Sequence, residues 1–140
     1  EKIWDFQTGS WILSSPSAED EYIYFGSDDK KFYCLEAKTG NKIWDFCAGD
    51  KISSSPCIAE GFIYFGSSDK KLYCLNARTG VKSWEFETGG DIWSSPCIVN
   101  GLVYFGSNDR KLYCLDTGRA GISGGNSLNV KQFRPTFAPR

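Results

Sequence analysis

Residues 41–80 read NKIWDFCAGDKISSSPCIAEGFIYFGSSDKKLYCLNARTG, and the same pattern occurs three times along the chain. By direct count this stretch is identical to residues 1–40 at 24 of 40 positions and to residues 81–120 at 21 of 40, with no insertion. A repeat of fixed period indicates a structural unit that stacks on copies of itself. The sequence therefore predicts three tandem units, at residues 1–40, 41–80 and 81–118.

Each unit is expected to fold into four short β-strands. In the second unit, segments 52–58, 62–66, 71–75 and 82–86 are rich in β-branched and aromatic residues or alternate with period two. Turn-forming residues separate them, and helical periodicity is absent from the sequence. Four strands in about 40 residues are typical of a β-propeller blade. The expected fold class is therefore all-β, built from propeller blades.

The segments that lead into two of the tryptophans resemble a known family. Leu35 to Trp44 reads LEAKTGNKIW and Leu75 to Trp84 reads LNARTGVKSW. Both are similar to the tryptophan-docking segment of pyrroloquinoline quinone (PQQ) repeats, and the flanking Ser-Ser-Pro and Tyr-Phe-Gly-Ser motifs resemble the same quinoprotein-like propellers. The resemblance extends over about residues 1–118 and implies the fold rather than an activity.

The repeated tryptophans Trp4, Trp44 and Trp84 are expected to pack between blades. A ring on an outer strand can lie over the turn of a neighbouring blade, where small residues such as Ala37 and Gly40 let it approach. A large aromatic side chain buries about 150–250 Å². We therefore interpret these tryptophans as structural residues.

Length and composition exclude several classes of function. The chain has 140 residues, a formal net charge of −1, no His, and 22 aromatic residues (5 Trp, 7 Tyr and 10 Phe). A near-neutral charge does not favour a nucleic-acid partner. No apolar run approaches the roughly 20 residues of a membrane-spanning helix. Without His there is no imidazole base, Ser-His-Asp triad or His-bound metal.

Three blades are too few to close a ring, since propellers have at least four. The sequence lacks Met and opens with an expected outer strand, Lys2–Phe6, so we expect a fragment or a processed chain. Either further blades belong to the parent chain, or two copies form a homodimeric six-bladed ring in which each N-terminal strand completes the other copy's last blade. Residues 119–140 are expected to form a Gly/Ser-rich linker and tail, with 130–133 as a displaced strand.

The cysteines follow the repeat. Cys34, Cys74 and Cys114 fall on the third strand of a blade, whereas Cys57 and Cys97 fall on the first. Within one blade, two strand spacings of about 9–10 Å separate these positions, and this exceeds the reach of a disulfide. A contact between cysteines of neighbouring sheets is the alternative that this distance leaves open. The expectation is free thiols, which favours a reducing or anaerobic setting, against the periplasmic or extracellular bias of the family. Zinc is disfavoured because no Cys-x-x-Cys pair occurs.

An aspartate recurs in the motif Gly-Ser-x-Asp-x-Lys, as Asp29, Asp69 and Asp109. One interpretation is a ring of acids on one face. The alternative, which equal recurrence in every unit favours, is a hairpin turn in which Asp accepts hydrogen bonds from backbone amides. The basic residues that follow are expected to be solvated at the rim; they are Lys30, Lys31, Lys70, Lys71, Arg110 and Lys111.

Function on a repeat scaffold is expected where the repeats differ. The links between blades differ most, at 7–11, 47–51 and 87–93. A four-stranded meander puts these links and the aspartate turns on one face. The predicted partner-binding face comprises Trp11, Lys51, Asp91 and Trp93, beside Asp28, Ser68 and Asn108. The alternative is that Trp11 and Trp93 only fill the axial channel.

The leading prediction is a non-catalytic module that acts as a binding or scaffold element for protein partners, with no catalytic residue, metal or cofactor. One alternative is a fragment of a PQQ-dependent dehydrogenase. The resemblance implies that such enzymes need a calcium ion, an Asp base and two adjacent disulfide-bonded cysteines, and no two cysteines here are adjacent. The other alternative is a lectin-like, carbohydrate-binding propeller that uses Trp11 and Trp93.

Overall fold

The computed structural model describes residues 1–118, which form three antiparallel sheets and no helix. The first sheet contains β1 (Ser17–Glu19), β2 (Tyr22–Gly26), β3 (Lys31–Glu36) and β4 (Lys42–Cys47). The second contains β5 (Cys57–Ala59), β6 (Phe62–Gly66), β7 (Lys71–Asn76) and β8 (Lys82–Glu87). The third contains β9 (Cys97–Val99), β10 (Leu102–Ser107) and β11 (Lys111–Asp116).

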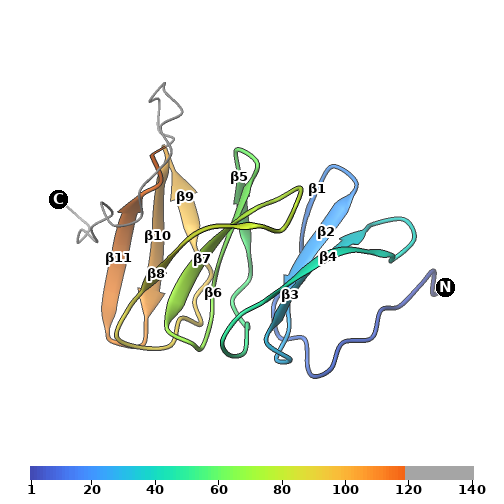
Figure 1. The fold of residues 1–140 in the computed structure, drawn as a ribbon, viewed down its shortest axis with the longest axis horizontal. Helices are drawn as coiled ribbons and strands as arrows, with labels where there is room; N and C mark the ends of the chain where they lie inside the picture. The colour runs from blue at the N-terminus through green and yellow to red at the C-terminus, as the bar shows by residue number, and fades with distance from the viewer. Residues whose placement is uncertain (119–140) are drawn as a thin grey trace.

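Each sheet is a meander in which strands follow one another in sequence order. The short strands β1, β5 and β9 contact one another, so they form the inner edge of the assembly. The sheets stand side by side as an open arc (Figure 1). This arrangement confirms the prediction of all-β propeller blades in an incomplete ring.

The strand predicted at 52–58 is wrong in its first part, because β5 begins only at Cys57. Pro56 has no amide hydrogen to donate to a sheet. The Ser54 hydroxyl binds backbone instead, donating to Ser94 O at 2.8 Å and accepting from Gly66 N at 3.1 Å. This serine joins two sheets, so the segment is a link rather than a strand.

The N-terminal strand predicted at Lys2–Phe6 is also absent from the structure, where residues 1–8 have no strand assignment. The physical reason is that this segment has no neighbouring strand to pair with among residues 1–118. At the other end of the arc the third sheet has three strands instead of four. The linker, the tail and the strand predicted at 130–133 lie outside the described residues.

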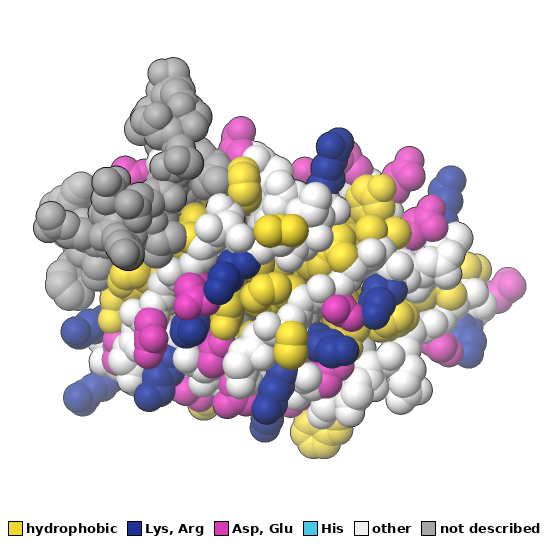
Figure 2. All heavy atoms as spheres, in the orientation of Figure 1, with side chains coloured by type: hydrophobic (Ala, Val, Ile, Leu, Met, Phe, Trp, Pro, Cys, Tyr) yellow, Lys and Arg dark blue, Asp and Glu magenta, His cyan; other side chains and the backbone are white. Residues whose placement is uncertain are grey.

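The core lies between the sheets. Phe32 of β3 stacks on Phe65 of β6 with ring centroids 4.2 Å apart, and Phe65 stacks in turn on Tyr73 at 5.4 Å. A second cluster between the second and third sheets includes Leu72 and Phe105. On the face seen in Figure 2, hydrophobic side chains form a broken band across the middle, and charged side chains lie both within this band and at the edges. Packing between neighbouring repeats thus adds to the packing within each one.

A tryptophan ring lies over the hairpin of the next sheet at two positions. The indole of Trp44 donates a hydrogen bond to Ala77 O at 3.1 Å, and Trp4 donates one to Ala37 O at 3.0 Å. Gly80 has φ 74°, and a Cβ there would lie 2.5 Å from the Trp44 ring. Glycine is thus required at this turn by both backbone conformation and space.

Gly80→Ala should therefore destabilise the protein more than Gly61→Ala. Both glycines have positive φ, where alanine costs about 1–2 kcal/mol. A Cβ at Gly61 meets nothing within 4 Å, whereas at Gly80 it meets Trp44, which adds about 1–3 kcal/mol of overpacking. Urea titration measures the two free energies of unfolding, and equal losses would contradict the contribution of the Trp44 contact.

Candidate functional site

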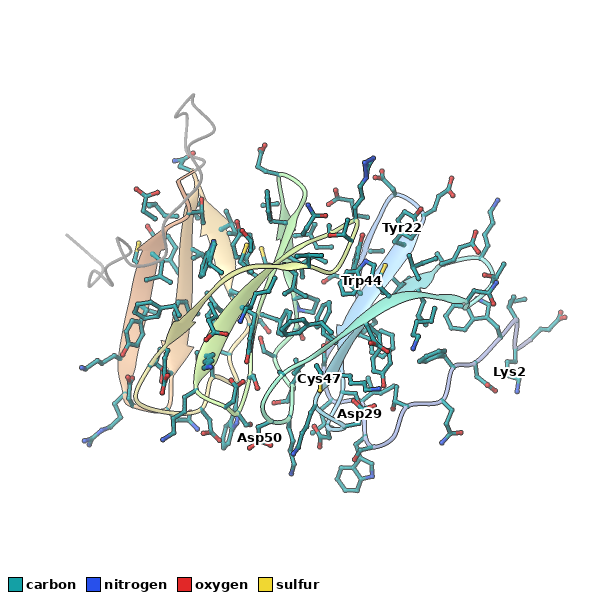
Figure 3. The ribbon with its side chains drawn as sticks, viewed as in Figure 1. Lys2, Tyr22, Asp29, Trp44, Cys47 and Asp50 are labelled. Atoms are coloured by element: carbon teal, nitrogen blue, oxygen red, sulfur yellow. The ribbon has the colours of Figure 1, made fainter. Side chains whose placement is uncertain are left out.

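The links between sheets and the aspartate turns gather at one end of the arc. Asp29 and Asp50 lie at this end and Tyr22 at the opposite one (Figure 3). In each repeat a turn amide donates to the carbonyl of the link residue 17 positions earlier. The three bonds are Asp28 N to Trp11 O at 2.8 Å, Ser68 N to Lys51 O at 2.9 Å and Asn108 N to Asp91 O at 2.8 Å. Backbone bonding thus holds each predicted link residue beside its turn.

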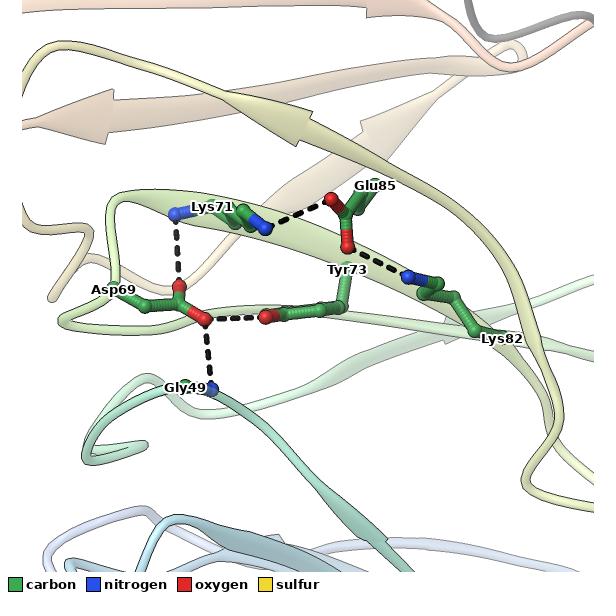
Figure 4. Close-up of polar contacts among 6 residues, drawn as sticks. All are labelled: Gly49, Asp69, Lys71, Tyr73, Lys82 and Glu85. Carbon is green, nitrogen blue, oxygen red and sulfur yellow. Dashed lines mark hydrogen bonds and ion pairs between the residues drawn. The ribbon is translucent and has the colours of Figure 1, made fainter.

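The repeated aspartate is the centre of each turn (Figure 4). One oxygen of Asp69 accepts from Lys71 N at 3.0 Å, and the other accepts from Gly49 N at 3.0 Å and from the Tyr73 hydroxyl. Asp29 and Asp109 make the same set of bonds. The turn interpretation is therefore confirmed. Sequence reasoning missed the tyrosine, although it follows the aspartate by four residues in every repeat.

The carboxylates of Asp29 and Asp109 stay ionised near neutral pH, and the tyrosines bonded to them stay protonated. Burial alone would raise the pKa of Asp29, but hydrogen bonds from the Tyr33 hydroxyl and two backbone amides outweigh it and hold that pKa below its ordinary value. The same causes lower the pKa of Asp109. Burial and the bond to Asp109 raise the pKa of Tyr113 to about 12. Such groups fix a turn and are poorly suited to proton transfer near neutral pH.

One rim lysine is paired rather than simply solvated. Lys71 contacts Glu85 at 2.9 Å, and Lys82 contacts the same carboxylate at 2.7 Å (Figure 4). Burial would raise the pKa of Glu85, but the two lysines outweigh burial and lower it. The Lys71 pair joins β7 to β8, whereas the Lys82 pair lies within β8. Both pairs are partly exposed and add little net stability.

A shallow groove of about 560 Å³ runs across the link end. Three of the four predicted face residues line it, namely Lys51, Asp91 and Trp93. The remaining lining residues are Leu13, Asp28, Asp50, Ser53 and Ser68. The Trp93 indole donates to Ser68 Oγ at 3.1 Å, yet 57% of the residue is exposed. The groove therefore has a fixed aromatic wall between acidic and basic side chains.

Trp11 lies outside the groove lining and is 74% exposed. Both face tryptophans thus present their rings to solvent in this arc instead of filling a channel. Sequence reasoning missed Leu13, which is also exposed and lies where the groove meets the first link. A large apolar residue at a link position was the available signal.

A second groove of about 470 Å³ lies at the opposite end, between the first and second sheets. Its walls include Tyr22, Ile43 and Phe62, with Glu60 and Arg78 beside them. Sequence reasoning gave no sign of it, because the groove forms only where two hairpins of neighbouring sheets meet.

Residues 1–118 contain no group of three or more His, Cys, Asp or Glu side chains placed to hold a metal ion. Asp28, Asp50 and Asp91 share the groove without forming such a group. This donor set does not fit the calcium centre that resemblance to a quinoprotein dehydrogenase implies. The same part of the chain has no helix long and apolar enough to span a membrane.

All six cysteines lie within the described residues and carry thiols rather than disulfides. Burial raises the pKa of Cys34 to about 11, against a smaller opposing effect of the Tyr24 hydrogen bond. Burial also raises the pKa of Cys57, although a hydrogen bond with the Ile98 backbone in the next sheet opposes it. These two thiols remain protonated at neutral pH and pack as small apolar groups.

The carboxylate turns predict a specific dependence of stability on pH. Because the pKa of Asp29 is lower in the folded protein than its ordinary 3.8, the stability it adds is complete above that value. That stability is lost as the pH falls through the lower folded value. Tyr33→Phe should cost about 1–3 kcal/mol at pH 7, and less near pH 2.

Tyr22→Phe at the exposed opposite end is the matched control and should leave stability unchanged at both pH values. Urea titrations at the two pH values measure these differences. An equal cost of Tyr33→Phe at pH 7 and pH 2 would show that ring packing, not the charged hydrogen bond, sets its contribution.

Two solved structures share this fold. BamB from Moraxella catarrhalis superposes with a TM-score of 0.73 at 17% identity, over 84% of this chain and 40% of that one. The quinohemoprotein alcohol dehydrogenase ADHIIG from Pseudomonas putida HK5 superposes with a TM-score of 0.68 at 22% identity, over 82% of this chain and 20% of that one. The chain thus spans well under half the length of either protein.

No curated protein matches the sequence significantly. A PQQ-repeat family model described as outer membrane protein assembly factor BamB matches residues 1–120. This match covers most of the chain and confirms the resemblance to PQQ repeats. The chain therefore belongs to the PQQ-repeat family described as outer membrane protein assembly factor BamB.

Proposed function

We propose that this chain is a non-catalytic scaffold module that binds a protein partner at its link end. The observation that carries the proposal is the groove in which Trp93 is exposed yet fixed by Ser68, beside Lys51 and Asp91. Tryptophan is among the residues that most often dominate the binding energy of protein interfaces, and a ring already held in place loses little freedom on binding. The turn carboxylates contribute rigidity, because their hydrogen bonds are already satisfied.

The family description supports a protein partner, since it names an assembly factor for outer membrane proteins. We infer that this chain likewise binds a protein partner. Its rigid turns present one face without rearrangement, which lowers the entropic cost of binding.

The dehydrogenase alternative rests on the fold shared with ADHIIG over 20% of that enzyme. The described residues hold no group of three or more His, Cys, Asp or Glu side chains placed to bind a metal for its chemistry. The carbohydrate alternative rests on the exposed Trp11 and Trp93, whose rings are suited to stacking on a sugar. The larger share of charged groups in the groove favours a protein.

A photo-cross-linking amino acid at position 13, where an exposed leucine lines the groove, should capture one discrete protein in the source cells, and the same group at position 22 should not. Tyr22 is the matched control because it is a partly exposed aromatic residue at the opposite end. The captured protein is then identified by mass spectrometry, purified and titrated. Trp93→Ala should weaken its binding by at least about 30-fold, and Tyr22→Ala should not.

Two further titrations separate the alternatives. PQQ with calcium should give no protein-bound quinone absorbance and no dye-linked alcohol oxidation, and a glycan array should give no signal that Trp11→Ala or Trp93→Ala removes. Quinone binding, or a glycan signal that depends on these tryptophans, would overturn the proposal. Equal cross-linking from positions 13 and 22 would do the same.

A further inference from the structure

The third sheet ends in an unpaired strand. Among residues 1–118, β11 pairs only with β10, whereas its counterparts β3 and β7 each carry a fourth strand beyond them. Leu112 of β11 is 49% exposed, while its counterparts Phe32 and Leu72 are fully buried between sheets. This end of the arc therefore presents both an open strand edge and an uncovered apolar face.

The other end of the arc offers the complementary parts. Residues 2–6 repeat the sequence of β4 and already lie on the first sheet as β4 lies on the second. The indole bonds are Trp4 Nε1 to Ala37 O at 3.0 Å and Trp44 Nε1 to Ala77 O at 3.1 Å, and the ring centroids of Phe6 and Tyr33 lie 5.3 Å apart against 5.2 Å for Phe46 and Tyr73. The segment thus has the position of a fourth strand and lacks only a strand beside it.

The two ends also match in shape. Ile92 is fully buried against Gly66, where a Cβ would come within 2.1 Å of it. Ile12 is the counterpart of Ile92 in the first link and is 45% exposed. Gly106 is the counterpart of Gly66, and the nearest atom to a Cβ there is Ser94 Oγ at 3.7 Å. One end therefore has the glycine without its isoleucine, and the other has the isoleucine without its glycine.

We propose that a second copy of this chain covers the open end. Residues 2–7 of one copy pair with β11 of the other, and Ile12 seats on Gly106. Two such head-to-tail contacts close a ring of six sheets, which lies within the four to eight blades of known propellers. Neither copy has to rearrange, because the N-terminal segment stays on its own first sheet. This inference concerns the ends of the arc and is independent of the proposed function.

The pairing of β7 with β8 gives the register of the exchanged strand. By this register the facing pairs between copies are Gln7 with Lys111, Phe6 with Leu112, Asp5 with Tyr113 and Trp4 with Cys114. Asp5 takes the place of Glu85, which forms an ion pair with Lys71 at 2.9 Å. Asp45, which has the same length as Asp5, pairs instead with Lys42 at 2.7 Å, and Asp5 pairs with Lys2 of its own copy at 2.9 Å. The complementarity of the contact therefore rests on shape and register.

Gly106→Ala tests the contact without disturbing the single chain. Light scattering on the whole 140-residue chain should give twice its 15.6 kDa mass, at all concentrations above the dissociation constant. Gly106→Ala should raise that constant by at least about 25-fold, since the added methyl group meets Ile12 at both contacts. Within one copy the methyl group has room, so near-ultraviolet circular dichroism of the variant should match that of the wild type.

Leu112→Arg is an independent test, because its side chain is exposed in one copy. It should also produce monomers, while Val81→Arg, a change at another exposed apolar residue, should leave the dimer intact. The register is tested by Gln7→Cys with Lys111→Cys in a Cys47→Ser, Cys97→Ser background. The N-terminal segment and β11 lie at opposite ends of the arc (Figure 1). A disulfide between the two new cysteines should therefore appear only as a covalent dimer, and neither single cysteine should form it.

A wild-type chain that is monomeric would overturn the proposal, because its own residues or solvent would then cover β11. A mass that keeps rising with concentration would also overturn it, since that is the behaviour of an open head-to-tail filament. A dimer that Gly106→Ala and Leu112→Arg leave intact would place the interface elsewhere.

Discussion

The close approach of Ile52 and Ile92 to a glycine of the preceding sheet is the constraint on which the arc depends. Ile52 lies on Gly26 and Ile92 lies on Gly66, so closely that no side chain fits at either glycine. The Ile92 amide also donates to Ser67 O at 3.0 Å. The link is therefore fixed to the sheet it leaves before it enters the next one. Spacing and direction of successive sheets are set at this point.

Aromatic packing follows from that spacing. Once the sheets are fixed about one side-chain layer apart, Phe32 can stack on Phe65 and Phe46 can meet Tyr73 edge-on. The same tyrosine then extends its hydroxyl to Asp69 in the turn. One side chain thereby connects the core between two sheets to the surface at the link end. The rigidity of the candidate face is a consequence of core packing.

Local patterns predicted the repeat, the β-class and most strand positions, since β6 begins and ends at the residues expected from alternation and turn chemistry. They failed where neighbours decide the outcome. Lys2–Phe6 has the composition of a strand but no partner to bond with, and the segment before Pro56 bonds through Ser54 to another sheet. The sequence predicted only part of the groove. Lys51 and Trp93 line it from two different links, and the separation of these links depends on the packing of the sheets.

In the links the main chain and the side chains have different roles, and this difference explains why binding is expected there. The bonds that hold each link to its turn use the main-chain carbonyls of Trp11, Lys51 and Asp91, and their side chains take no part in them. A link side chain can therefore change while its backbone keeps the same partner. The turn differs, because Asp69 anchors Gly49 and Tyr73 through its own carboxylate and cannot change without loosening the hairpin. In this fold the side chains that repeat stabilise the hairpins and the core, and the side chains that differ among repeats are available for recognition.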